Sequence, residues 1–134
     1  MSKTRIVAID YGAKRVGLAI SDAGQNIALP WKTVPGDFQS VVTTLKSREG
    51  EIQKILIGLP LLMNGTKGDM ANIVEAFAKK LELALSIPVI LLDERLSSKH
   101  ADTILRETGQ NRRQRSEKLD ATAATLLLQS HLDH

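Results

Sequence analysis

Short apolar runs rich in β-branched residues alternate with segments of helical spacing along this 134-residue chain. Such runs predict strands, and apolar residues three and four positions apart predict helices. Strands are expected at residues 5–10, 16–21, 27–29 (ending near Pro30), 54–59 and 88–93. Helices are expected at residues 37–48, 70–85, about 98–108 and about 116–132.

The segment 70–85 has the strongest helical pattern. Apolar residues at spacings of three and four are expected to form its buried face. They are Met70, Ile73, Val74, Phe77, Leu81 and Leu85.

The order of these elements predicts a single α/β domain over residues 1–134, a mixed sheet with helices on its faces. The first three strands are able to form a meander. The strands at 5–10, 54–59 and 88–93 are expected to run parallel, joined by crossover helices. Their C-terminal ends then share one sheet edge, where open α/β sheets usually bind ligands.

Three acids occupy positions where a lone carboxylate is costly to desolvate. Asp10 ends the first strand, Glu94 follows the fifth, and Asp120 interrupts the apolar face of the last helix. At 100° per residue, Asp120 lies on the same helix face as Ala123, Ala124 and Leu127. This face is expected to be the buried side of the helix. Carboxylate-only ligation suits magnesium or manganese, so a divalent-metal site is predicted.

Two other interpretations of these acids remain open. Each acid is able to pair with a neighbouring base instead, Asp10 with Lys14 or Arg15 and Glu94 with Arg95. An Asp-x-Gly sequence after a strand also opens the phosphate loop of actin-like ATPases. Those enzymes need two lobes, and neither glycine-rich nucleotide fingerprint is present here, so ATPase activity is not expected.

Composition narrows the class of protein. The chain has no cysteine, no apolar run near the ~20 residues that a membrane span needs, and no signal-peptide pattern, which favours a cytoplasmic protein. The net charge is only +3, but cations predominate between residues 95 and 118. A positive surface favours nucleic acid, whereas a solvated charged loop is the plainer interpretation.

Four segments together resemble the motifs of the YqgF family, also called RuvX, of the RNase H-like superfamily. They are Asp10 to Ala19, Gly58-Leu59-Pro60 with Asn64-Gly65-Thr66, Asp93 to Ser98, and Lys118 to Ala124. They stand in the family's order and extend over essentially the whole chain. Each segment alone is a weak signal, and the four together are highly specific.

This resemblance implies an RNase H-like fold with strand order 3-2-1-4-5 and an antiparallel second strand. It implies a metal-dependent nuclease whose metal ligands are Asp10, Glu94 and Asp120. Bacterial members of the family are linked to maturation of the 5′ end of pre-16S rRNA. The alternatives are a Holliday junction resolvase and a non-catalytic RNA-binding factor in ribosome assembly.

Nucleic-acid contacts are expected from basic side chains near the acids, which are Lys14, Arg15, Arg95, Arg112, Arg113 and Arg115. Asp93 adjoins Glu94, but strand alternation sends the two side chains to opposite faces, and Glu94 is the expected ligand. Gly12 and Gly17 are expected to keep side chains out of the space beside Asp10, and the strand end at Gly58 is expected to be a small position that Glu94 reaches across. The apolar residues of the late helices are needed to cover the sheet, so a monomer or weak homodimer is expected.

Overall fold

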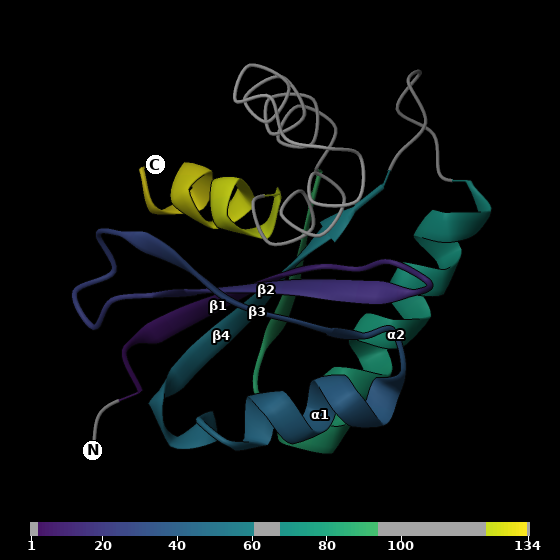
Figure 1. The fold of residues 1–134 in the computed structure, drawn as a ribbon, viewed down its shortest axis with the longest axis horizontal. Coiled ribbons are helices and arrows are strands. Elements are labelled where there is room, and N and C mark those ends of the chain that lie inside the picture. The colour runs from purple at the N-terminus through teal and green to yellow at the C-terminus, as the bar shows by residue number, and fades with distance from the viewer. Residues whose placement is uncertain (1–2, 61–67, 94–122, 134) are drawn as a thin grey trace.

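A five-stranded mixed sheet organises the protein in a computed structural model that describes residues 3–60, 68–93 and 123–133 (Figure 1). In chain order the elements are β1 (Arg5–Asp10), β2 (Arg15–Ser21), β3 (Ala28–Pro35), α1 (Phe38–Lys46), the 3-10 helix η1 (Glu49–Glu51), β4 (Ile52–Leu59), α2 (Asp69–Leu85) and β5 (Val89–Asp93). Residues 123–132 form a C-terminal helix. The helix predicted at 98–108 lies outside the described residues.

The strand order β3-β2-β1-β4-β5 confirms the predicted topology. β1 pairs antiparallel with β2 and parallel with β4, and β4 pairs parallel with β5. β2 and β3 form an antiparallel hairpin. The C-terminal ends of β1, β4 and β5 therefore lie along one sheet edge, as the sequence predicts.

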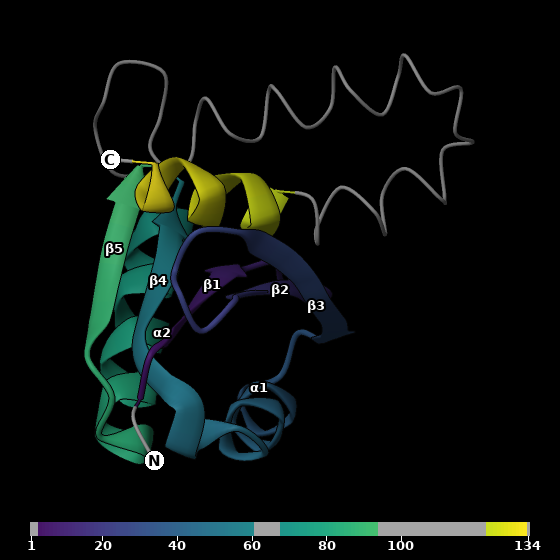
Figure 2. The same ribbon diagram turned by 90° about the vertical axis from the view of Figure 1, so that its left-hand side faces the viewer.

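Helices cover both faces of this sheet (Figures 1 and 2). α1 and α2 pack on one face, over a core cluster that includes Val7, Ile9 and Ile57. The C-terminal helix packs on the other face, where Leu128 contacts the cluster that contains Ala8. From Ile6 to Ile9, β1 is thus apolar and buried on both sides, as expected of a central strand. No helix in the described part of the chain is long and apolar enough to cross a membrane.

β3 is longer than the sequence pattern predicts. The expected end near Pro30 is wrong, since the strand continues to Pro35. β3 is an edge strand, and an edge position tolerates prolines because no outer strand needs their missing N–H. A bulge also occurs here: Ala19 pairs with Pro30 and Leu18 with Lys32, which leaves Trp31 as the extra residue.

The buried face of α2 is also shifted from the predicted one. Met70 and Ile73, expected to be buried, are 39% and 49% exposed, whereas Ala71 and Ala78 are buried. The other members of the buried face are Val74, Leu81 and Leu85. The two alanines permit a close approach of the helix to the sheet. The spacing of the larger apolar residues alone does not predict that these alanines are buried.

Gln129 fastens the C-terminal helix to the β2–β3 hairpin. Its side-chain carbonyl Oε1 accepts a hydrogen bond from the Ala28 N–H at 2.8 Å, and its Nε2 donates to the Asn26 carbonyl at 3.1 Å. These bonds satisfy backbone groups of the edge strand and fix the position of the helix along the sheet.

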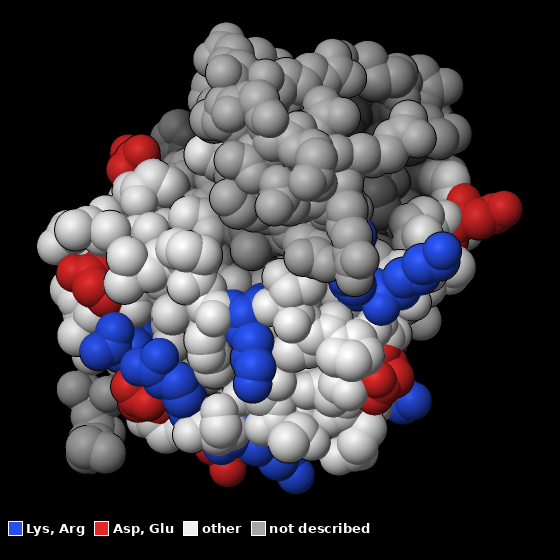
Figure 3. Space-filling model, in the orientation of Figure 1, with Lys and Arg blue, Asp and Glu red and all other residues white. Residues whose placement is uncertain are grey.

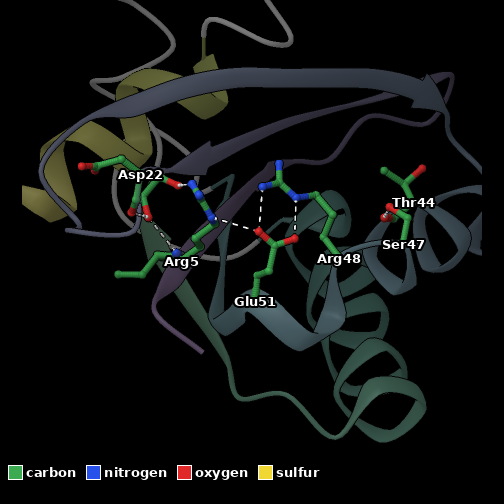
Figure 4. Close-up of polar contacts among 8 residues, drawn as sticks. Arg5, Asp22, Thr44, Ser47, Arg48 and Glu51 are labelled. Carbon is green, nitrogen blue, oxygen red and sulfur yellow. Dashed lines mark hydrogen bonds and ion pairs between the residues drawn. The ribbon is translucent and has the colours of Figure 1, made fainter. Parts of the chain in front are cut away.

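An ion-pair network holds the same end of the sheet, where β1 begins (Figure 4). Glu51 accepts hydrogen bonds from Arg48 Nε at 2.9 Å and from Arg5 Nε at 3.1 Å. The Arg48 guanidinium also lies 5.7 Å from the centre of the Trp31 ring, and Trp31 packs against the core cluster on the face that α1 and α2 cover. The hydrogen bond from Arg48, aided by the charges of Arg48 and Arg5, lowers the pKa of the Glu51 carboxyl.

Replacing Glu51 by Gln is expected to lower the melting temperature at pH 7. The pKa of this carboxyl is lowered in the folded protein from its ordinary value of 4.5, so its contribution to stability is present above that value. The contribution is lost as the pH falls through the folded pKa. The melting temperatures of Glu51→Gln and of the wild type, measured from pH 7 down to pH 3, are therefore expected to converge.

Glu49→Gln is the matched control, because Glu49 is exposed in the same 3-10 helix. Its melting temperature should follow that of the wild type throughout. A constant difference between Glu51→Gln and the wild type over the whole pH range would contradict a role for the charge.

Candidate metal and nucleic-acid site

Asp10 is the last residue of β1 and lies half-buried at the C-terminal edge of the sheet. Side chains alternate along a strand, and Ile6 and Ala8 pack on the face covered by the C-terminal helix. Asp10 follows in the same alternation and therefore projects toward that face. The strand places a carboxylate where its apolar surroundings end.

Two glycines flank Asp10 within the sheet. Gly17 on β2 is its direct pairing partner. On the other side Ile9 pairs with Ile57, so Gly58 is one step further along β4, beside Asp10. Both glycines are buried, and neither carries a side chain that would fill the space next to the carboxylate. The register thus places Gly17 beside Asp10, as expected. Gly12 lies in the turn instead, where a Cβ would lie 2.5 Å from the Arg15 carbonyl oxygen.

β5 continues the same edge. Gly58 pairs with Leu92, and Leu59 pairs with Asp93 at the end of the strand. Leu92 packs on the same face as Ala8, whereas Leu91 packs on the opposite face. By this alternation Asp93 is directed away from the face that Asp10 shares, as the sequence predicts for one of the two adjacent acids.

The described part of the C-terminal helix buries the predicted face. Ala123, Ala124 and Leu127 are 3%, 0% and 4% exposed, and Ala124 and Leu127 belong to the cluster beneath Asp10's face. The remaining predicted site residues lie outside the described residues; they are Glu94, Arg95, Arg112, Arg113, Arg115 and Asp120. Within residues 3–60, 68–93 and 123–133 no three acids or histidines group as metal ligands.

Two of the predicted basic residues do lie beside Asp10. Lys14 is exposed in the turn between β1 and β2, and Arg15 is half-buried at the start of β2. Val16 and Leu18 pack on the α1–α2 face, so Arg15 is directed by alternation to the same face as Asp10. An acid and a base from one hairpin thus share the sheet face at this edge.

Gly36 packs against the turn that follows Asp10. The sequence did not indicate this role for Gly36. The Gly36 N–H donates to the Lys14 carbonyl at 2.9 Å. A Cβ at Gly36 would lie 2.4 Å from the carbonyl oxygen of Ala13 and 2.8 Å from that of Gly12, so only glycine fits. Val34-Pro35-Gly36-Asp37 reads as an ordinary turn, and nothing in it indicates contact with residues 12–14.

Tyr11 anchors the same turn from the side of α2. Its ring lies 4.8 Å from that of Phe77, centre to centre, and Phe77 meets Phe38 edge-on at 5.8 Å. These are three of the four aromatic residues in the chain. Aromatic pairs of this geometry stabilise by about 0.5–1.5 kcal/mol beyond the area they bury. The segment that follows Asp10 is therefore fixed to both helices of this layer.

A family model described as "RuvX: Holliday junction resolvase" matches residues 4–134. The chain belongs to the RuvX family. One RuvX-like relative, named "Putative pre-16S rRNA nuclease", from Chlorobium phaeobacteroides, is 44% identical over 135 residues, 97% of this chain and 92% of that protein. A protein of the same name from Protochlamydia amoebophila is 40% identical over 140 residues, 97% of this chain and 93% of that protein.

A solved structure also matches this RuvX-family protein. It is described as "T. thermophilus RuvC in complex with Holliday junction substrate", with a TM-score of 0.56 and 96% of each chain covered. Sequence identity is 13%, so this likeness bears on the fold alone. It agrees with the RNase H-like topology that the resemblance implies.

Replacing Gly36 by Ala is expected to lower the free energy of unfolding by about 1–3 kcal/mol, because the added methyl group overpacks the backbone of residues 12 and 13. Denaturant unfolding at pH 7 measures the loss. The backbone amide resonances of Ala13 and Lys14 should shift, since the turn has to move.

Gly50→Ala serves as the control, because a Cβ at Gly50 meets nothing within 4 Å. Its stability should stay close to that of the wild type. Equal stabilities of the two variants would show that the turn yields without cost and is not held by Gly36.

Proposed function

We propose that this protein is a metal-dependent endonuclease that hydrolyses phosphodiester bonds of structured RNA, in maturation of the 5′ end of pre-16S rRNA. One observation carries the proposal: Asp10 ends a central strand whose residues 6–9 are buried, between two glycines, on the face where the C-terminal helix packs. The names of the curated relatives support the reaction and the substrate. The proposed place of work is the cytoplasm.

The proposed metal ligands are Asp10, Glu94 and Asp120, and the proposed ions are magnesium or manganese. Hard cations of this kind prefer carboxylate oxygens and keep several waters. When bound, a pair of such ions supplies an activated water and stabilises the leaving oxygen of the phosphodiester. The chain's own part is to hold the carboxylates at the sheet edge and to keep Gly17 and Gly58 small beside them.

The lengths of the elements support a position for Asp120 near Asp10. Gln129 is bonded to Ala28, which pairs with Ser21, and Ser21 bonds the N–H of Ile6 at the start of β1. In the helix predicted over about residues 116–132, the nine positions from 129 back to 120 would correspond to about 13 Å at 1.5 Å each. The four strand positions from 6 to 10 also correspond to about 13 Å.

Phosphate contacts are proposed for Lys14 and Arg15, which lie beside Asp10, and for Arg95, Arg112, Arg113 and Arg115. Cations hold the scissile phosphate against the acids and offset the repulsion between carboxylates and the polyanion. The competing role for these bases is ion pairing, of Lys14 or Arg15 with Asp10 and of Arg95 with Glu94.

A Holliday junction resolvase is the second candidate, favoured by the description of the family. Both functions use one carboxylate site, but symmetric resolution of a four-way junction requires two sites in a dimer. We propose a monomer or weak homodimer, which favours the single cut in RNA. A non-catalytic RNA-binding assembly factor is the third candidate, and retention of all three acids in the sequence argues against it.

The metal assignment predicts that manganese raises the melting temperature of the wild type and that Asp10→Asn abolishes the rise, because binding to the folded state alone stabilises it. Without metal, Asp10→Asn should fold normally. Cleavage of a pre-16S rRNA precursor should fall by orders of magnitude in Asp10→Asn, Glu94→Gln and Asp120→Asn. Parallel incubation with a four-way DNA junction separates the two nuclease functions.

Glu49→Gln removes an exposed carboxylate elsewhere and should keep both the metal-dependent rise and the cleavage. Cleavage by Asp120→Asn at the rate of the wild type would contradict the assignment of the three acids as metal ligands. Paired, coordinated nicks in the four-way junction, together with a tight dimer in sedimentation, would instead support the function of a Holliday junction resolvase.

Replacing Arg112, Arg113 and Arg115 together by Ala is expected to weaken binding to RNA and to flatten its dependence on salt. Each lost phosphate contact lowers the slope of log affinity against log salt by about 0.7–0.9. Titrations between about 50 and 200 mM salt measure the slope. A slope equal to that of the wild type would mean that these arginines do not touch phosphate.

A further inference from the structure

The two edges of the sheet differ in their protection against pairing with another strand. An exposed edge strand presents unpaired N–H and C=O groups, and proteins usually protect it with prolines, lysines or bulges. β3 has all three, in Pro30, Lys32, Pro35 and the bulge at Trp31. Lys and Arg side chains also stand at the centre and along the lower part of the side of the molecule from which β3 is seen (Figure 3).

β5 forms the other edge of the sheet and has none of these features within Val89–Asp93 (Figure 2). Its first four residues are apolar, and its register with β4 is regular along the whole strand. Ile90 is 38% exposed. β5 is therefore a regular, apolar edge, and no strand in the described part of the chain pairs with its outer side.

The hydrogen bonds of β5 show which of its backbone groups point outward. The Ile55 N–H donates to the Pro88 carbonyl at 2.9 Å, so Pro88 faces β4. Backbone direction alternates along a strand, and Val89 and Leu91 therefore direct their N–H and C=O groups away from the sheet. The Val89 N–H agrees with this, because it donates to Glu82 Oε2 at 2.8 Å. The outward N–H and C=O of Leu91 have no partner among the described residues.

We infer that β5 pairs antiparallel with β5 of a second copy of this chain, around a two-fold axis at Leu91; this specifies the contact of the weak homodimer proposed above. Leu91 of each copy donates its N–H to the Leu91 carbonyl of the other, which satisfies all four outward groups. On the face that the C-terminal helix covers, Ile90 lies opposite Leu92 of the second copy and buries its exposed side. Asp93 lies opposite Val89, so the two aspartates do not face each other.

The position of α2 agrees with this pairing. α2 packs over both β4 and β5, and neighbouring strands are ~4.8 Å apart, so the two α2 helices of the pair would lie about 10 Å apart. Packed helices usually lie at such a distance, so α2 does not obstruct the second copy. The facing sides carry both signs of charge, because Lys79 and Glu75 lie on the same side of α2 as Glu82, three and seven positions before it.

The size of the contact and the Glu82 carboxylate predict a weak dimer. The five residues of β5 on each side are far fewer than the roughly 20–30 of a stable interface. Glu82 also occupies the Val89 N–H, which in a paired edge donates to the Asp93 carbonyl of the second copy. Pairing has to displace this carboxylate, so its removal is expected to strengthen the dimer.

Sedimentation equilibrium from low micromolar to near-millimolar concentration tests the pairing. The wild type should change from monomer to dimer over this range, and hydrogen exchange of the Leu91 amide should slow as the dimer forms. Glu82→Ala should dimerise several-fold more tightly, because the Val89 N–H becomes available to the second copy. Ile90→Lys should stay monomeric, because its charge would be buried against Leu92 of the second copy.

Two matched controls make the same changes at exposed positions away from β5. Glu49→Ala removes a carboxylate from the 3-10 helix, and Ile27→Lys replaces an isoleucine that is 56% exposed beside β3. Both should dimerise like the wild type. Melting temperatures close to that of the wild type confirm that each variant is folded, and the gain expected for Glu82→Ala tests the inference without any loss of stability.

A wild type that stays monomeric at every concentration overturns the inference, as does a dimer that Ile90→Lys retains or that Glu82→Ala does not strengthen. An edge that instead receives a strand of a different protein would leave the purified chain monomeric, which overturns the inference in the same way. Manganese-dependent cleavage of RNA by the wild type tests the nuclease separately. A dimer with the expected variant effects but without any cleavage would keep the β5 contact and reject the nuclease.

Discussion

The position of a single carboxylate at the end of a buried strand is the constraint on which the rest of this structure depends. β1 is paired on both sides and covered on both faces, so an ionised group is tolerated only where this cover stops. Asp10 stands at that point. Gly17 and Gly58 on the neighbouring strands place no side chain beside it.

The surrounding structure fixes this end of β1 mainly through the backbone. Gly36 packs on the turn after Asp10 so closely that no side chain fits, and Tyr11 ties the same turn to α2 through Phe77. A site held by rigid neighbours keeps its geometry at little entropic cost when a ligand binds. The Arg5–Glu51–Arg48 network holds the far end of the sheet, away from the acid. Stability and the proposed chemistry are thus supported at opposite ends of β1.

The charges near the proposed site follow the same geometry. The β1–β2 hairpin directs Arg15 to the same sheet face as Asp10, and Lys14 stands exposed in the turn between them. The connection from β3 to α1 supports this turn through Gly36. An acid and two bases therefore share this end of the sheet.

The sequence by itself determined the order and type of the elements, the parallel arrangement of β1, β4 and β5, and the placement of Asp10 at their common edge, because these depend on local periodicity and short connections. It also indicated the buried face at Ala123 and Ala124. Only the tertiary structure decided that β3 passes Pro30, that α2 buries alanines in place of Met70, and that Gly36 supports the turn at Asp10. Each of these depends on contacts between segments distant in the chain, which no local pattern records.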